Sequence, residues 1–310
     1  MIDTRKQFTG LIAAPLAPMD RHGQLRPEVV GKYARFLHRQ GVKGVFLNGT
    51  SGEGVSLRRA ERKELTQAWV EESPADFSVV VNVSHTSIYR SQELASFAAE
   101  VGADGVSTMS AFFYRPASLE RLVDYCKGIA EVVPNTPFYY YHIPVMTSVD
   151  YPMVDFLKLA GEQIPSLAGV KYTKENRVDF EACRLVNQGQ YNILSGCDDM
   201  LVSSYATGCR GFIGSTYNFA APLYVEMMRL FDNGQVGEAN QLQNYFVEVI
   251  QVMAKSGDYF AAAKRVMREL GVECGGVRQP LTPIPDSEFD SMMKELEGLA
   301  FFEKLEQLSK

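Results

Sequence analysis

The sequence predicts an α/β protein, a (β/α)8 barrel of the TIM type with a small C-terminal helical domain. Eight short apolar runs alternate with eight segments of helical apolar spacing between residues 10 and 231, which is the rhythm of such a barrel. No Gly-x-Gly-x-x-Gly turn follows the first run, although a dinucleotide-binding doubly wound sheet would carry one there. Strand count alone leaves the doubly wound sheet open as the competing architecture.

The strand-helix units follow one another along the chain without a tandem repeat. Apolar runs of strand length predict strands at 10–16, 44–47, 77–83, 105–109, 137–142, 166–171, 191–194 and 211–214. Helical apolar spacing predicts helices at 27–40, 57–71, 87–101, 118–133, 151–160, 179–188, 198–207 and 221–231. After residue 234 only helices are predicted, at 236–254, 259–270 and 287–309, with a proline-rich link at 280–285 before the last. We therefore expect a catalytic barrel over residues 1–233 and a helical domain over residues 234–310.

The composition restricts the classes of partner. Apolar residues make up 46% and charged residues 22% of the chain, which is typical of a globular protein. The net charge of -6 argues against nucleic acid as a partner. No apolar run reaches the roughly 18 residues that a membrane-spanning helix needs. Residues 1–10 are polar and lack the core of a signal peptide, so we expect a cytoplasmic protein without a membrane partner.

The cysteines and histidines indicate no metal site. The five cysteines are odd in number and form no C-x-x-C pair, which favours neither a disulfide framework nor a zinc site. The four histidines are well separated in the sequence. We therefore expect no bound metal.

The sixth predicted strand ends in a lysine, Lys171. A strand of a parallel barrel is buried on both faces, so a lysine at its carboxyl end is expected to face a cavity. Burial of an ammonium group costs several kcal/mol and usually lowers the pKa of the lysine, which leaves a free amine that attacks ketones. The alternative is a strand that ends one residue earlier, with Lys171 in solvent.

In such a barrel the active site lies at the carboxyl ends of the strands, where further polar residues collect. The second strand is followed by residues 48–54 (Asn-Gly-Thr-Ser-Gly-Glu-Gly), a glycine-rich turn that carries the hydroxyls of Thr50 and Ser51. Such a turn directs N–H groups and hydroxyls at an anion of carboxylate or phosphate size. An ordinary turn with a helix N-cap is the alternative.

The fifth strand carries three tyrosines in a row. Strand alternation sends Tyr139 and Tyr141 to one face and Tyr140 to the other. A phenol inside the barrel mouth, near an amine and hydroxyls, can move a proton between substrate and solvent. Alternatively, the three aromatic rings only fill a core.

Polar residues also follow the seventh and eighth strands. Asp198 and Asp199 begin the next helix, where they serve either as helix caps or as acceptors for a polyhydroxylated substrate. Residues 211–218 end in a second small, hydroxyl-rich turn.

Together these strand ends bring a lysine, a tyrosine, an anion-binding turn and contacts for a polar tail to one barrel mouth. This set fits a class I aldolase, in which the amine forms an iminium with a 2-oxo acid and the phenol moves the proton. The iminium accepts the electrons of the broken carbon–carbon bond. This chemistry requires neither a metal nor an organic cofactor.

Four motifs carry a resemblance to a known family: residues 48–54, 139–144 (Tyr-Tyr-Tyr-His-Ile-Pro), 169–173 (Gly-Val-Lys-Tyr-Thr) and 214–218 (Gly-Ser-Thr-Tyr-Asn). The chain resembles, nearly end to end, the dihydrodipicolinate synthase and N-acetylneuraminate lyase family of pyruvate-dependent (β/α)8 aldolases. The resemblance implies that Lys171 is the Schiff-base lysine and Tyr141 the general acid/base. It also implies that Thr50 and Ser51 hold the pyruvate carboxylate, and that Thr50 links Tyr141 into a proton relay.

Positions that bind the rest of the substrate favour the lyase branch of this family. The synthase branch places an arginine five residues after the catalytic tyrosine, where this chain has Met146, and a thioether cannot pair with a carboxylate. The lyase branch contacts a sugar's glycerol tail and hydroxyls, and the matching residues here are Thr173, Gly196, Asp198, Asp199 and Ser215. Asp199 stands where some lyases carry glutamate, so its shorter side chain changes the reach toward the tail.

The resemblance implies a Schiff-base aldolase that reversibly cleaves N-acetylneuraminate (sialic acid) to N-acetylmannosamine and pyruvate. Two alternatives stay open: a related pyruvate-dependent aldolase or synthase, such as a dihydrodipicolinate synthase or a 2-keto-3-deoxy sugar acid aldolase, and a non-catalytic sugar-acid-binding barrel. The family also implies a homotetramer. Residues 110–116 resemble the loop that family members place near a neighbouring subunit's site, which makes Phe113 and Tyr114 the expected contact residues.

Overall fold

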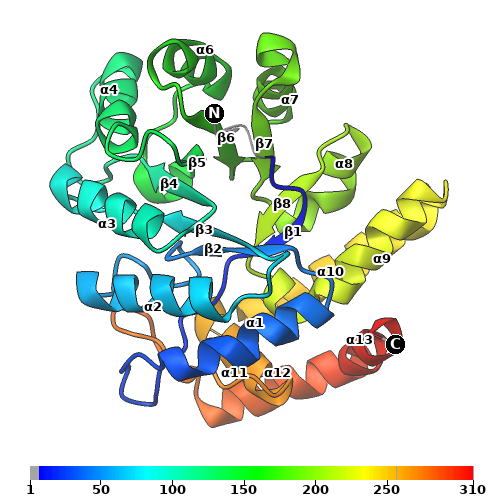
Figure 1. The fold of residues 1–310 in the computed structure, drawn as a ribbon. Helices are drawn as coiled ribbons and strands as arrows, with labels where there is room; N and C mark the ends of the chain where they lie inside the picture. Colours follow the sequence, from blue (N-terminus) through cyan, green and yellow to red (C-terminus); the bar gives the residue numbers. More distant parts are fainter. Residues whose placement is uncertain (1–6, 256, 310) are drawn as a thin grey trace.

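Eight parallel strands close into a barrel in sequence order in the computed structural model, which describes residues 7–255 and 257–309 (Figure 1). The strands are β1 (Gly10–Ala13), β2 (Gly44–Leu47), β3 (Ser78–Asn82), β4 (Gly105–Met109), β5 (Phe138–His142), β6 (Leu167–Tyr172), β7 (Asn192–Ser195) and β8 (Gly211–Gly214). Because β8 pairs with β1, the sheet closes on itself. The predicted (β/α)8 barrel is confirmed, and the doubly wound sheet is wrong.

At least one helix follows every strand. The helices that surround the barrel are η1 (Pro27–Val29), α1 (Val30–Arg39), α2 (Arg59–Glu72), α3 (Ile88–Glu100), α4 (Leu119–Ala130), α5 (Pro144–Thr147), α6 (Met153–Gln163), α7 (Arg177–Leu185), η2 (Val186–Gly189), η3 (Asp198–Met200), α8 (Leu201–Ala206) and α9 (Tyr217–Asp232). The C-terminal helices are α10 (Val236–Lys255), α11 (Tyr259–Glu269), α12 (Asp286–Gly298) and α13 (Phe301–Leu308). The predicted strand-helix order is therefore confirmed, with shifted boundaries.

Three features of the helices differ from the prediction for local physical reasons. The single helix expected over 287–309 is two helices, because Ala300 adopts a left-handed φ of 54° between α12 and α13. Helix α9 begins four residues before the predicted start and continues through Pro222, with the backbone departing from helical geometry at Ala220. The short helix α5 was not predicted; it begins at Pro144, whose fixed φ suits the first helical position.

Alternation along the strands divides the buried side chains into two groups. The barrel interior is filled by a compact cluster that includes Ile12, Phe46, Val80, Tyr139 and Tyr141. Tyr140 lies in the larger cluster between strands and helices, where its ring packs on Phe156 of α6 at 4.6 Å between ring centroids. The predicted directions of the three tyrosines are thus confirmed. Because the interior is packed, polar groups at the strand ends lie on an apolar layer.

The C-terminal helices gather on one side of the barrel, drawn from yellow to red in Figure 1. α10 and α13 pack on α9. Two polar contacts reach the first helices: Ser309 donates to Gln40 Oε1 at 3.2 Å, and Arg278 donates to both carboxylate oxygens of Glu61 on α2 at 2.7 and 2.6 Å. The domain boundary at residue 233 stays a prediction. None of the helices in the described residues is long and apolar enough to cross a membrane.

Close packing of β6 on β7 gives a stability prediction. Gly169 lies opposite Asn192, and a Cβ at Gly169 would collide with the Asn192 carbonyl oxygen. We expect Gly169→Ala to lower the free energy of unfolding by about 1–3 kcal/mol, the usual cost of overpacking a core. Urea unfolding followed by circular dichroism measures this change.

Gly237 in α10 provides the matched control, because a Cβ there meets no atom within 4 Å. Gly237→Ala should be neutral or stabilising by up to about 1 kcal/mol, since alanine favours helix. An unfolding midpoint for Gly169→Ala equal to that of the wild type would contradict the packing argument.

Candidate active site

Lys171 lies on β6 one residue before the strand ends, and only 4% of its surface is exposed. The alternative of a lysine in solvent is therefore wrong. Its Nζ lies 4.3 Å from the ring centre of Phe46 on β2 and 4.1 Å from the ring centre of Tyr141 on β5. Aromatic rings attract a cation, but they replace only part of the hydration that an ammonium group loses on burial. The amine is thus turned into the barrel and desolvated.

Burial lowers the pKa of Lys171 from 10.5 to about 7. Desolvation is the largest cause, because it penalises the charged form of the amine. The negative charge of Asp198 acts in the opposite direction and raises the lysine pKa. Near neutral pH the free amine of Lys171 is therefore accessible without a large energetic cost.

Tyr141 is the neighbour of Lys171 in the sheet, since β5 and β6 pair these two residues. Its ring meets Phe46 edge to face, with 5.3 Å between ring centroids. Burial raises the pKa of Tyr141 to about 12, and the hydroxyls of Thr50 and Thr173 oppose that shift. Thr50 Oγ1 lies 3.3 Å from the phenol oxygen. In the resting protein Tyr141 is therefore a proton donor, and it becomes a base only after it has given up its proton.

Thr50 and Ser51 belong to the glycine-rich turn after β2, where Thr50 is half-buried and Ser51 is buried. Helix α2 begins only at Arg59, so the turn is not the N-cap of that helix. The turn is tight: Asn48 has a φ of 55°, and a Cβ at Gly54 would collide with the Asn48 carbonyl oxygen. The predicted Thr50–Tyr141 link is present as a contact between their hydroxyls.

Thr173 and Gly196 lie side by side just beyond β6 and β7. A Cβ at Gly196 would collide with Thr173 Oγ1, so glycine leaves the room that this hydroxyl occupies. Thr173 Oγ1 is buried and has no hydrogen-bond partner among the described residues, although it lies near enough to Tyr141 to influence that pKa. Because a buried hydroxyl without a partner is costly, Thr173 is suited to bond a ligand.

The two aspartates after β7 have different surroundings. Asp198 Oδ2 accepts hydrogen bonds from the Thr216 N–H at 3.0 Å and from the Thr216 hydroxyl at 2.6 Å, so it caps α9 and not its own helix. A Cβ at Gly214 would collide with the Asp198 carboxylate. Asp199 is exposed as a residue, yet partial burial of its carboxylate and the charges of Asp198 and Glu175 raise its pKa. The interpretation of Asp198 as a cap of the helix that it begins is therefore wrong, because its carboxylate bonds Thr216 at the start of α9.

Tyr259 is a polar neighbour of the site that sequence reasoning missed. Ser215, half-buried after β8, has its Oγ 3.3 Å from the hydroxyl of Tyr259 on α11. Burial raises the pKa of Tyr259, so its phenol stays protonated. Tyr259 follows no strand and belongs to no recognised motif, so only the packing of α11 reveals it.

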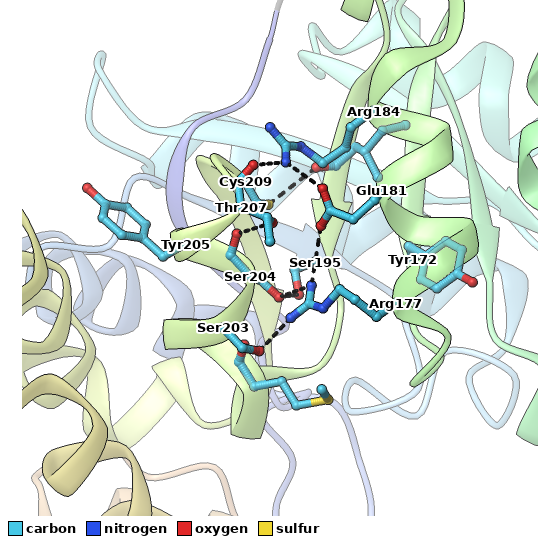
Figure 2. Close-up of polar contacts among 12 residues, drawn as sticks. Tyr172, Arg177, Glu181, Arg184, Ser195, Ser203, Ser204, Tyr205, Thr207 and Cys209 are labelled. Carbon is cyan, nitrogen blue, oxygen red and sulfur yellow. Dashed lines mark hydrogen bonds and ion pairs between the residues drawn. The ribbon is translucent and has the colours of Figure 1, made fainter. Parts of the chain in front are cut away.

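A polar network braces the end of β7. Figure 2 shows Arg177 of α7 reaching to Ser203 and Ser204 of α8, at 2.5 and 3.2 Å. Ser204 Oγ in turn lies 3.2 Å from Ser195 Oγ, at the last residue of β7. The cavity beside Arg177 and Ser204 measures about 10 Å³, which leaves room for about one water molecule. This network therefore fixes the strand end and offers no second substrate site.

The aromatic pair predicted to contact a neighbouring subunit is exposed. Phe113 and Tyr114 are 73% and 86% exposed, and their rings meet edge to face at 5.0 Å between centroids. Phe112, which the sequence did not single out, packs against the barrel-interior cluster. The subunit contact of Phe113 and Tyr114 stays a prediction. Met146 lies on α5 and is 57% exposed.

The arrangement brings together a buried amine on β6, a phenol on β5 and a glycine-rich turn after β2, with carboxylates and hydroxyls after β7 and β8. A neutral amine next to a phenol is suited to attack on a carbonyl group and proton transfer. Within residues 7–255 and 257–309, no three His, Cys, Asp or Glu side chains gather closely enough to hold a metal ion.

Comparison with known proteins agrees with this geometry. Residues 7–299 match the model of the dihydrodipicolinate synthetase family. The chain is 36% identical over 295 residues to N-acetylneuraminate lyase of Danio rerio, covering 94% of this chain and 96% of that protein. It is 34% identical over 301 residues to the human protein of that name, covering 96% and 94%. Among solved structures, N-acetylneuraminate lyase of Proteus mirabilis superposes with a TM-score of 0.92 at 31% identity, covering 96% of this chain and 100% of that chain.

The low pKa of Lys171 predicts its reactivity as a function of pH. In competitive labelling with trace acetic anhydride, acetylation of Lys171 should level off above about pH 7, whereas lysines with the ordinary pKa of about 10.4 should continue to gain reactivity beyond pH 9. Peptide mass analysis reports each site separately.

Asp198→Asn should move the midpoint for Lys171 to still lower pH, because the carboxylate favours the ammonium form. A midpoint near pH 10 in the wild type, or an upward shift in Asp198→Asn, would contradict the electrostatic argument.

Proposed function

Since this chain belongs to the dihydrodipicolinate synthetase family, we propose that it is a Schiff-base (class I) lyase that reversibly cleaves N-acetylneuraminate to N-acetylmannosamine and pyruvate. The names of its relatives from Danio rerio and human support this substrate. The observation that carries the proposal is the buried amine of Lys171, whose pKa falls to about 7 beside the ring of Tyr141. A desolvated amine next to a phenol serves carbonyl chemistry.

The reaction begins with attack of Lys171 Nζ on the C2 ketone of the open-chain sugar. The lone pair of the neutral amine forms the C–N bond, the ketone oxygen leaves as water, and a cationic iminium results. The iminium draws electrons from the C3–C4 bond, which breaks to give an enamine on Lys171 and the aldehyde of N-acetylmannosamine. Protonation of the enamine and hydrolysis then release pyruvate and restore the amine.

Tyr141 balances the protons of these steps. With a pKa of about 12 it begins as a phenol and gives its proton to the departing ketone oxygen. The iminium places a positive charge where the amine stood, and this charge favours the phenolate. The phenolate then accepts the C4 hydroxyl proton and returns it to the enamine carbon. Thr50, 3.3 Å from the phenol oxygen, relays protons between Tyr141 and solvent.

The residues after β2 hold one part of the substrate, and those after β6, β7 and β8 hold another. Thr50 and Ser51 receive the carboxylate next to the C2 ketone, through their hydroxyls and the N–H groups of their turn. The sugar hydroxyls and the glycerol tail meet the opposite set, Thr173, Gly196, Asp198, Asp199 and Ser215. The unpartnered Oγ1 of Thr173 supports this assignment. Carboxylates suit hydroxyl donors, because an ionised carboxylate only accepts hydrogen bonds.

We also propose a cytoplasmic homotetramer that uses no cofactor beyond Lys171. The exposed rings of Phe113 and Tyr114 support an assembly in which this loop is covered by a neighbouring subunit. The Schiff base formed by Lys171 supplies the electron sink that a metal or organic cofactor supplies elsewhere.

Two rivals are less well supported. A synthase needs a cation for the second carboxylate, and Met146 offers a thioether at the position that would carry it. A non-catalytic sugar-acid-binding barrel would have no use for an amine with a pKa lowered to about 7.

Borohydride trapping tests both the chemistry and the substrate. Incubation with N-acetylneuraminate followed by borohydride should leave a reduced pyruvate adduct on Lys171, located by peptide mass analysis. An adduct with pyruvate but none with N-acetylneuraminate would keep the aldolase chemistry and remove the substrate assignment. An adduct with neither would favour the binding-protein rival.

Tyr141→Phe should lower kcat by about 10²–10⁴-fold, the usual contribution of a positioned acid/base group. Tyr139→Phe is the matched control, because Tyr139 lies on the same strand face with its hydroxyl donating to Asn192 Oδ1 at 3.0 Å, within the barrel interior. Turnover should stay close to wild type in Tyr139→Phe. Equal kcat values for wild type and Tyr141→Phe would remove Tyr141 from the mechanism.

A further inference from the structure

The glycine-rich turn after β2 is tied to the C-terminal helices by a buried ion pair. Lys264 of α11 donates to Glu53 Oε1 at 2.6 Å, and their side chains are 0% and 1% exposed. The two residues are 211 positions apart in the sequence. Glu53 belongs to the same turn as Thr50 and Ser51. The contact therefore joins the proposed carboxylate-binding turn to a helix of the C-terminal part of the chain.

Every polar end of this pair has a fixed partner. Lys264 Nζ also donates to the Gly276 carbonyl oxygen at 2.6 Å. Glu53 Oε2 accepts the Arg278 backbone N–H at 2.8 Å. The guanidinium of Arg278 continues the contact to Glu61 at the start of α2. The ion pair is thus the centre of a network that holds together the turn after β2, helix α11 and the segment that follows α11.

Glu53 transmits this restraint to the substrate-binding residues through the backbone. Its N–H donates to the Thr50 carbonyl oxygen at 3.0 Å, which closes the turn that carries Thr50 and Ser51. Glu53 itself has a φ of 51°, a left-handed conformation that a residue other than glycine adopts only where its surroundings hold it. The side-chain contacts of Glu53 are the surroundings that hold it.

A buried ion pair is a poor means of gaining stability alone, because desolvation of both charges offsets their attraction. Two apolar side chains of similar volume would pack at least as well. The pair instead provides directional hydrogen bonds. These bonds fix the position of Glu53 relative to the backbone of Gly276 and Arg278, whereas an apolar contact would allow the turn to rotate. Burial lowers the pKa of Lys264, and the charge of Glu53 opposes that shift because it favours the ammonium form of the lysine.

We infer that Lys264 is a positioning residue for substrate binding: through Glu53 it sets the turn in which Thr50 and Ser51 receive the carboxylate. This inference rests on the proposed function, since it assigns the turn to the carboxylate of a 2-oxo acid. It makes the C-terminal helices part of the binding site, although Lys264 does not touch the substrate.

A comparison of two ketones distinguishes a positioning role of Lys264 from a general structural role. Pyruvate and acetone both form an iminium with Lys171, but only pyruvate carries a carboxylate. The half-saturating concentration of each ketone in borohydride trapping is measured for wild type and for Lys264→Met. Lys264→Met should raise the value for pyruvate about tenfold or more, the factor expected for loss of a charge-assisted hydrogen bond. The value for acetone should stay within about twofold of wild type, because the same fold still presents Lys171.

The double variant Glu53→Gln/Lys264→Met carries the same test without leaving a buried charge unpaired, and so covers the case in which the single variant fails to fold. Lys63→Met and Glu93→Gln/Lys63→Met are controls for the loss of an ion pair as such, because Lys63 and Glu93 form a half-buried 2.8 Å ion pair between α2 and α3. These controls should leave both ketone values unchanged.

Parallel changes in the pyruvate and acetone values, or no change in either, would overturn the inference. If wild-type protein traps no pyruvate, the proposed function fails instead, because the variants are compared only through that reaction.

Discussion

The proposed reactivity depends on the desolvation of one amine, that of Lys171. In water Lys171 would be an ammonium ion without a lone pair, and it could not attack a ketone at neutral pH. Burial beside Phe46 and Tyr141 lowers its pKa to about 7, and that burial has an energetic cost that the barrel interior must offset. A mobile loop could not exclude water so completely. Asp198 limits the shift, because its negative charge favours the ammonium form of Lys171.

Closure of the sheet makes this environment possible. β5 and β6 are adjacent, so the register alone brings Tyr141 beside Lys171. Phe46 lies on β2, and it meets both residues across the interior only because the eight strands form a closed barrel. In an open sheet with the same strands, β2 and β6 would lie apart and the amine would have a single aromatic neighbour. The closed barrel therefore lowers the pKa of Lys171 in addition to positioning the residues around it.

Much of this was predictable because it follows from short-range patterns. Period-two alternation placed Tyr141 and Tyr140 on opposite faces of their strand, and an apolar run ending in lysine indicated the burial of Lys171. Tyr259 and Lys264 could not be found in this way. Their helix has the pattern of any amphipathic helix, and their partners Ser215 and Glu53 become neighbours only through tertiary packing. The break at Ala300 was missed because alanine gives no local signal for a left-handed φ.

In the proposed mechanism, the charge distribution around the strand ends orients the substrate. The turn of Thr50 and Ser51 presents hydroxyls and N–H groups, whereas Asp198 and Asp199 follow β7. The raised pKa of Asp199, to which Asp198 contributes, indicates that further negative charge there is unfavourable. A sugar acid with its carboxylate near these aspartates would be repelled, while its hydroxyls can donate to them. In the proposed mechanism the carboxylate is therefore directed to the turn after β2, and the ketone next to it then meets Lys171. On this proposal, orientation by charge precedes the chemistry and selects the carbonyl group that reacts.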